Sequence, residues 1–330
     1  MTKYILGVDI GGTKSHALIA DESGRALGLG VGGAGNYEVV GYCGLTETLN
    51  AITNKALAIA GISKAQLAGA GFGIAGYDWP VEREPTYQAI QTLGLTAPFE
   101  FVNDTIIGLL AGAAEGWGVA VVAGTSNNCR GRDRQGREGR VTGNGPWFGE
   151  YGGANEMVTK ARQAVAAAWT QRGPATCLTE AFINFTGATD ILDLLEGLAL
   201  ERYQLSAAAA PLIFQAAAEG DDVAREIIFW AGRELGSLAV GVIRQLGFEQ
   251  LDFDVVLIGT LFKASPALAG TMMTTIYQVA PTARPVRLVA PPVVGGVLLG
   301  MEQIGVEYSA MRQTLIESAR AMLNQGWSRD

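Results

Sequence analysis

Short alternating runs of hydrophobic and polar positions open the chain, and longer helical patterns follow them. The first runs, at 4–9, 16–20 and 25–31, are separated by glycine-rich and acidic turns and predict three antiparallel strands. Apolar positions repeat at helical spacing over 38–60, which predicts a helix. Further strand and helix patterns lie at 68–75, 86–93, 99–102 and 105–114. The predicted order is βββαβαβα.

A similar order begins again after Gly118. A strand pattern at 119–123 leads into a hairpin over 130–141, and helical patterns cover about 155–246. Strand, helix and strand patterns return at 255–258, 266–279 and 286–289, and a last helix is predicted at about 309–323. This alternation is typical of an α/β protein with two similar lobes and a helical insertion in the second.

The length of 330 residues exceeds what one hydrophobic core usually supports. We therefore expect a first lobe at 1–116 and a second lobe at 117–305. The C-terminal segment, about 306–330, is expected to pack back on the first lobe. A cleft between the lobes would then be available to a small ligand.

Composition and charge remove several classes of partner. No apolar run reaches the roughly 20 residues of a membrane span, and the N-terminus lacks a signal-peptide pattern. We expect a soluble cytoplasmic protein that does not bind membranes. The net charge is -8, from 24 basic and 32 acidic residues, which argues against a nucleic-acid partner. The five arginines between Arg130 and Arg140 alternate with glycines and acids, a pattern typical of a solvated hairpin.

The few cysteines and the single histidine restrict the possible chemistry. Cys43, Cys129 and Cys177 lie far apart and form no CxxC pair, so we expect reduced thiols. His16 lies in a predicted strand, where a structural role is expected. A Ser-His-Asp or Cys-His arrangement would need that residue. Acid and base chemistry is therefore expected from carboxylates.

The strongest local motif follows the first predicted strand. Asp9 ends that strand, and the turn Gly11, Gly12, Thr13 and Lys14 follows. Glycines let backbone N–H groups approach phosphate oxygens, and a threonine adds a hydroxyl donor. A carboxylate at Asp9 can hold Mg²⁺, which phosphoryl transfer requires. Taken alone, the motif could also be a glycine turn with an incidental acid.

Two later segments support a nucleotide site. The turn after the strand at 119–123 contains Gly124, Thr125 and Ser126, again glycine followed by hydroxyls. Two such hairpins can hold one polyphosphate between them. Gly259 and Thr260 follow a late strand, where open α/β sheets commonly bind ligands. We expect this last segment to contact an adenosine.

Six segments together carry a resemblance to a known family: 9–14, 35–36, 102–104, 124–130, 259–260 and 295–300. Over essentially its whole length the chain resembles the N-acetylglucosamine kinases of the BadF/BadG/BcrA/BcrD ATPase family. This family lies in the superfamily of actin, sugar kinases and heat-shock chaperone ATPases. The resemblance implies two ribonuclease H-like, actin-like ATPase lobes. It also implies a homodimer that uses ATP and Mg²⁺ to phosphorylate an amino sugar.

The resemblance implies that Asp104 is the catalytic base. The residues point the same way, since Asp104 ends an apolar strand and begins a helix, which should place it at the cleft. A carboxylate there can accept the proton of an attacking sugar hydroxyl. The alternative is that Asp104 only caps the helix, as Asp often does before an apolar helix.

The resemblance also implies which residues contact the sugar. Asn36 matches a sugar-binding asparagine, although a turn residue would also fit there. Asn127 and Asn128 match the second hairpin of the family. The remaining implied contacts are Asp104, Asn144, Gly145 and Glu150.

The sugar loop departs from the family pattern. Glu150 stands where relatives carry an aspartate, and Asn144 stands where they carry a tryptophan. These changes leave the identity of the sugar open among N-acetylglucosamine, glucosamine, N-acetylmuramic acid and related sugars.

Two alternative functions remain at this stage. An ATPase activator of a CoA-ester dehydratase or reductase would share the family, but its dimer holds an iron-sulfur cluster through paired cysteines, which this chain lacks. A sugar-sensing regulator usually carries a helix-turn-helix ahead of the fold. Here the first predicted strand begins near Lys3.

Overall fold

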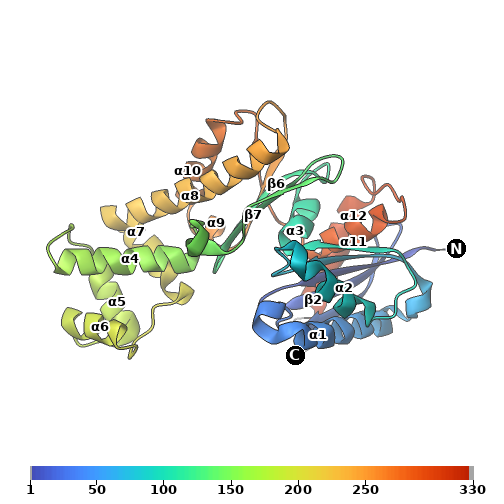
Figure 1. The fold of residues 1–330 in the computed structure, drawn as a ribbon, viewed down its shortest axis with the longest axis horizontal. Coiled ribbons are helices and arrows are strands. Elements are labelled where there is room, and N and C mark those ends of the chain that lie inside the picture. The colour runs from blue at the N-terminus through green and yellow to red at the C-terminus, as the bar shows by residue number, and fades with distance from the viewer. Residues whose placement is uncertain (1, 327–330) are drawn as a thin grey trace.

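Two five-stranded mixed sheets organise the chain, one in each half (Figure 1). The structure is a computed structural model that describes residues 2–326. The strands of the first sheet lie in the order β3-β2-β1-β4-β5 and those of the second in the order β10-β9-β6-β7-β8. The first sheet comprises β1 (Tyr4–Ile10), β2 (Ser15–Asp21), β3 (Ala26–Gly32), β4 (Leu67–Ile74) and β5 (Phe99–Asn103). The second comprises β6 (Gly118–Ala123), β7 (Asn127–Arg132), β8 (Glu138–Arg140), β9 (Asp254–Ile258) and β10 (Arg284–Arg287).

Both sheets follow one plan. β1 pairs antiparallel with β2 and parallel with β4, while β6 pairs antiparallel with β7 and parallel with β9. The hairpin between β1 and β2 is therefore equivalent to the hairpin between β6 and β7. The carboxyl ends of β1, β4 and β5 meet at one edge of the first sheet, so the residues that follow them come together. The predicted α/β fold with two similar lobes is confirmed.

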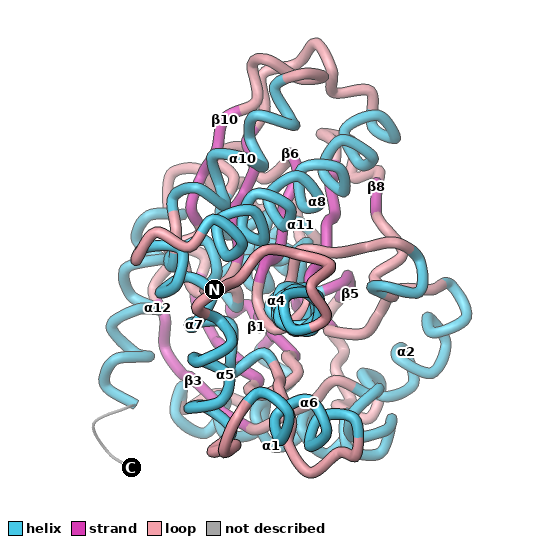
Figure 2. Tube along the Cα trace, turned by 90° about the vertical axis from the view of Figure 1, so that its left-hand side faces the viewer, coloured by secondary structure: helices cyan, strands magenta, loops and turns pink. Residues whose placement is uncertain are grey.

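Helices cover both sheets, as Figure 2 shows. The first lobe contributes α1 (Tyr37–Ala60), α2 (Arg83–Gln91) and α3 (Asp104–Gly112). The helical patterns at 155–246 form α4 (Ala154–Trp169), α5 (Leu178–Thr186), α6 (Ile191–Ala199), α7 (Ala210–Ala218) and α8 (Asp222–Leu246). α8 packs across β6, β7 and β8, much as α1 packs on β2 and β3. No helix in residues 2–326 is both long and apolar enough to cross a membrane.

The C-terminal third ends on the first lobe. After α9 (Leu261–Ala264) and α10 (Pro266–Tyr277), the helices α11 (Val293–Glu302) and α12 (Arg312–Gly326) lie beside the first sheet (Figure 1). α12 packs on β3, and α11 packs on β1, β4 and α3. Residues 327–330 of the expected C-terminal segment lie outside the described residues.

The spacing of apolar positions along the sequence did not predict α11. Its three glycines, Gly295, Gly296 and Gly300, lower intrinsic helix propensity. Tertiary packing stabilises the helix nonetheless, because the glycines allow a close approach. A Cβ on Gly295 would overlap the backbone oxygen of Ile107 in α3. α3 in turn packs on β6 and β9 of the second sheet, so the pair of helices α3 and α11 joins the two lobes.

Candidate active site

The turn between β1 and β2 is exposed. Gly12, Thr13 and Lys14 are exposed, and a Cβ on Gly12 would meet no atom within 4 Å. In the second hairpin Thr125 and Ser126 are exposed as well. Within residues 2–326 the hydroxyl of Thr13 makes no hydrogen bond, and neither do those of Thr125 and Ser126. Both hairpins can therefore donate to phosphate oxygens, as the sequence predicts.

Gly259 and Thr260, which follow β9, lie against the hairpin between β6 and β7. Gly259 has a φ of +113°, and a Cβ there would overlap the backbone oxygen of Ala123. Thr260, Gly124 and Thr125 line one cavity of about 310 Å³ together with apolar residues of α4 and α7. A second cavity of about 420 Å³ is lined by Gly259, Thr260 and His16, among others. The fold thus brings Gly259 and Thr260 close to both hairpins, as a nucleotide site requires.

Asp9 lies beside the only histidine of the chain. The two residues face each other in the β1–β2 register, and His16 Nδ1 is 3.8 Å from Asp9 Oδ2. The side chain of Asp9 is 15% exposed, so its carboxylate can reach a ligand. Magnesium is usually held by one or two carboxylates together with substrate phosphates. Asp9 lies next to the turn at 11–14, which is expected to hold the phosphates, so it fits that arrangement.

Asp104 begins α3 but does not cap it. Asn103 is the N-cap residue, and its Oδ1 accepts the N–H of Thr105 at 3.0 Å. The capping role considered from the sequence therefore belongs to Asn103. Burial raises the pKa of Asp104 to about 7, helped by the charges of Asp9 and Asp78 and opposed by Arg130. A carboxyl group with such a pKa is well matched to a general base at neutral pH.

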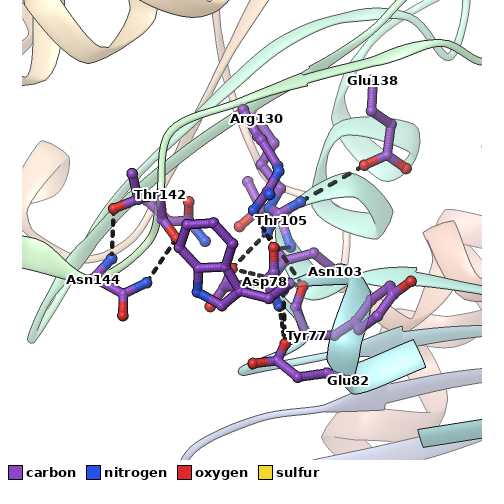
Figure 3. Close-up of polar contacts among 12 residues, drawn as sticks. Tyr77, Asp78, Glu82, Asn103, Thr105, Arg130, Glu138, Thr142 and Asn144 are labelled. Carbon is purple, nitrogen blue, oxygen red and sulfur yellow. Dashed lines mark hydrogen bonds and ion pairs between the residues drawn. The ribbon is translucent and has the colours of Figure 1, made fainter. Parts of the chain in front are cut away.

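Asp78 lies at the candidate site, although its sequence position did not predict it. It follows β4, and its Oδ1 accepts hydrogen bonds from Arg130 Nη2 at 2.5 Å and from Asn103 Nδ2 at 3.3 Å (Figure 3). Its backbone oxygen also accepts a bond from Arg140. The available signal was its position at the carboxyl end of a parallel strand, next to the strand that leads to Asp104.

The prediction of a solvated arginine hairpin is wrong for three of the five arginines. Arg130 is 3% exposed and pairs with Asp78 of the other lobe. Arg132 pairs with Glu302 of α11 at 2.7 Å, and Arg140 contacts the loop after β4. Arg134 and Arg137 are exposed, as predicted. Sequence spacing alone could not reveal partners that lie far away in the sequence.

The asparagines expected at the sugar occupy distinct places. Asn36 caps α1, with Oδ1 accepting the N–H of Glu38 at 2.9 Å, and it packs against Gly76 in the loop that leads to Asp78. Asn127 and Asn128 are successive residues of β7, so their side chains point to opposite faces. Asn127 is buried and donates to Glu156 of α4 at 3.2 Å. Asn128 lies on the face that carries Arg130.

The loop between β8 and α4 is organised by Glu150. This residue is 5% exposed, and its carboxylate accepts the N–H of Thr142 at 2.6 Å and the N–H of Gly145 at 3.4 Å. Asn144 is exposed, and its side-chain amide donates to the backbone oxygen of Thr142 at 2.9 Å. Gly143 packs on Asp78, because a Cβ there would lie 2.8 Å from a carboxylate oxygen. The loop between β8 and α4 therefore contacts Asp78 of the first lobe.

Two known proteins are similar in sequence to this chain. The chain is 26% identical over 323 residues to the N-acetyl-D-glucosamine kinase of Dictyostelium discoideum, covering 91% of this chain and 99% of the relative. It is also 26% identical over 250 residues to the N-acetylmuramic acid/N-acetylglucosamine kinase of Clostridium acetobutylicum, covering 75% and 81%.

The fold and the family are shown by two further findings. A solved protein of Chromobacterium violaceum, provisionally described as an N-acetylglucosamine kinase, superposes with a TM-score of 0.65 at 23% identity. That match covers 90% of this chain and 98% of the other. The sequence model of the BadF/BadG/BcrA/BcrD ATPase family matches residues 6–300. The chain therefore belongs to the BadF/BadG/BcrA/BcrD ATPase family.

Proposed function

We propose that this protein transfers the γ-phosphate of ATP to a hydroxyl of an amino sugar. N-acetylglucosamine or a close relative, such as glucosamine or N-acetylmuramic acid, is the expected acceptor. The observation that supports this best is Asp104, a carboxylate with a pKa of about 7 that is not needed as a helix cap. We place the activity in the cytoplasm and expect a homodimer.

In the proposed reaction Asp104 acts on the acceptor. The oxygen of the sugar hydroxyl attacks the γ-phosphorus as the bond to the bridging oxygen of ADP breaks, and Asp104 takes the hydroxyl proton. Backbone N–H groups and hydroxyls of the two hairpins hold the phosphates. Magnesium bound at Asp9 would neutralise phosphate charge. Gly259 and Thr260 would contact the adenosine.

The sugar would bind between Asn36 of the first lobe and the loop that carries Asn144, Gly145 and Glu150. Amide groups suit a sugar because each offers both donors and an acceptor. Asn128 lies on the same face of β7 as Arg130, which pairs with Asp78, so its amide would serve the sugar from that face. Asn127 would act by holding the loop, since its amide also reaches the backbone oxygen of Glu150.

The direct test is an ATP-consumption screen with mass detection of the product. The acceptors are N-acetylglucosamine, glucosamine, N-acetylmuramic acid and neutral hexoses. We expect a phosphorylated amino sugar and stoichiometric ADP. ADP without any sugar phosphate would favour an ATPase activator, although burial raises the pKa of the Cys129 thiol and leaves it a poor cluster ligand. Sugar binding without ADP would favour a regulator.

Thr13→Val and Thr125→Val test the phosphate role of the hairpins. Each change keeps the bulk of the side chain and removes one exposed hydroxyl donor. We expect KM for ATP to rise about tenfold in each variant, the effect of losing a hydrogen bond to a charged group. KM for the sugar should stay within about twofold. Steady-state kinetics with each substrate varied in turn measures both, and an unchanged KM for ATP in both variants would make the turns purely structural.

Glu150→Asp tests how the sugar loop is held. The shorter carboxylate cannot reach the N–H groups of Thr142 and Gly145 together, so the loop should loosen. We expect KM for the sugar to rise about five- to tenfold, the effect of one weakened charge-assisted bond, with KM for ATP unchanged. Equal kinetics for variant and wild type across the sugar panel would separate Glu150 from sugar binding.

A further inference from the structure

We propose that Asp78 is a specificity-determining residue that accepts a hydrogen bond from a non-reacting hydroxyl of the bound sugar. Arg130 and Asn103 would act as positioning residues by holding the Asp78 carboxylate. This inference rests on the proposed sugar kinase function. The family resemblance assigns no role to Asp78.

The position of Asp78 is the first reason. Its carboxylate packs on Gly143 of the sugar loop, and its charge contributes to the raised pKa of Asp104, the proposed base. Asn103 joins the two acids, since it precedes Asp104 and donates to Asp78. Asn36 packs against Gly76, two residues before Asp78. Asp78 is therefore linked to the sugar loop through Gly143, to Asp104 through Asn103 and to Asn36 through Gly76.

The rigidity of the segment is the second reason. Glu82 Oε2 accepts the backbone N–H groups of Asp78 at 2.7 Å and of Trp79 at 2.8 Å. Glu82 Oε1 accepts the hydroxyl of Tyr37 at 2.6 Å. Fixed backbone and side-chain contacts hold Asp78 in one orientation. Such support is what a residue that discriminates between sugars needs.

The unused hydrogen-bonding capacity is the third reason. Both bonds to the Asp78 carboxylate are made by Oδ1, whereas Oδ2 has no partner in residues 2–326. The Nε of Arg130 is buried and also lacks an acceptor. Buried polar groups are normally paired. Since the Asp78 side chain is 10% exposed, Oδ2 can accept a hydrogen bond from a ligand hydroxyl.

Asp78→Asn is the test, and Glu138→Gln is the matched control. Both changes remove one carboxylate charge beside Arg130. Glu138 lies 3.7 Å from Arg130 Nη1, and it lies on the opposite side of Arg130 from Thr142 and Asn144 (Figure 3). The asparagine amide would present a donor where the sugar needs an acceptor. Kinetics are measured with the sugar that the wild type phosphorylates and with its single-deoxy analogues, and thermal unfolding is recorded for each protein.

We expect Asp78→Asn to raise KM for the sugar at least tenfold, with KM for ATP within twofold. For the wild type, one of the deoxy analogues should be a much poorer substrate than the sugar itself. For Asp78→Asn, that analogue and the sugar should be equally good substrates. Glu138→Gln should leave both KM values unchanged. If the wild type is active and KM for the sugar is unchanged in Asp78→Asn, the inference is overturned. It is also overturned if KM for the sugar rises as much in Glu138→Gln as in Asp78→Asn. Wild type that phosphorylates no sugar overturns the proposed function, and this inference with it.

Discussion

Asp104→Asn is expected to lower kcat by about 10²-fold or more, the usual scale for a lost general base. KM for ATP and for the sugar should stay within several-fold, because the amide keeps the size of the side chain and one oxygen that can accept a hydrogen bond from the sugar hydroxyl. The wild-type kcat/KM should also fall below about pH 7, where Asp104 becomes protonated. The asparagine variant should lack this pH dependence. Steady-state kinetics from pH 5.5 to 8.5 measures both effects.

Thermal stability distinguishes catalysis from a structural role of Asp104. Its pKa in the folded protein, about 7, lies above the ordinary value of an unfolded aspartate. Ionisation therefore costs stability, and the cost grows as the pH rises from the unfolded to the folded pKa. At pH 8 the asparagine variant should be at least as stable as the wild type. Asn103→Ala is the control, because losing the cap of α3 should cost about 1 kcal/mol.

Two results would contradict a catalytic Asp104. Near-normal turnover of the asparagine variant would leave the carboxylate without a chemical role. A lower melting temperature at pH 8, together with lost activity, would instead mean that the negative charge stabilises the fold. The cap at Asn103 makes the second result unexpected, since α3 keeps its N-terminal hydrogen bond in the variant.

Local patterns were sufficient to predict most of the fold. The strands on either side of Gly11 and Gly12, and the strand before Gly124, are apolar runs that border glycine turns. Both hairpins lie where these runs predict them. The family and the two-lobed fold are confirmed for the same reason, since they rest on motifs that are continuous in the sequence.

Contacts between distant segments could not be predicted. The glycines of α11 disfavour a helix locally, and only the close approach to α3 explains them. Arg130 lies in a hairpin of charged and turn residues, yet its partner Asp78 is 52 positions earlier in the other lobe. The buried carboxylate of Glu150 bonds to its own loop. In each case tertiary packing, which one sequence does not display, decides the role of the residue.

Arg130→Met is expected to destabilise the protein by about 3 to 5 kcal/mol, the usual cost of removing one partner of a buried ion pair. Methionine fills a similar volume, so the main loss is the positive charge that faces Asp78 and Glu138. The melting temperature should fall by roughly 4 to 7 °C. Arg134→Met is the matched control, because Arg134 belongs to the same hairpin but is 64% exposed. Its loss should cost less than about 1 kcal/mol.

The pH dependence of this stability loss identifies its cause. Burial raises the pKa of Asp78, and Arg130 opposes that rise, so removing Arg130 should raise the pKa further. In Arg130→Met the ionised Asp78 carboxylate, without its partner, destabilises the fold at pH values above this raised pKa. The destabilisation disappears as the pH falls through the raised pKa and Asp78 becomes protonated. The difference in melting temperature between wild type and Arg130→Met should therefore narrow from pH 8 to pH 5. The double variant Asp78→Asn, Arg130→Met should be more stable than Arg130→Met at pH 8. A difference that stays constant with pH would mean that Arg130 contributes packing instead of charge.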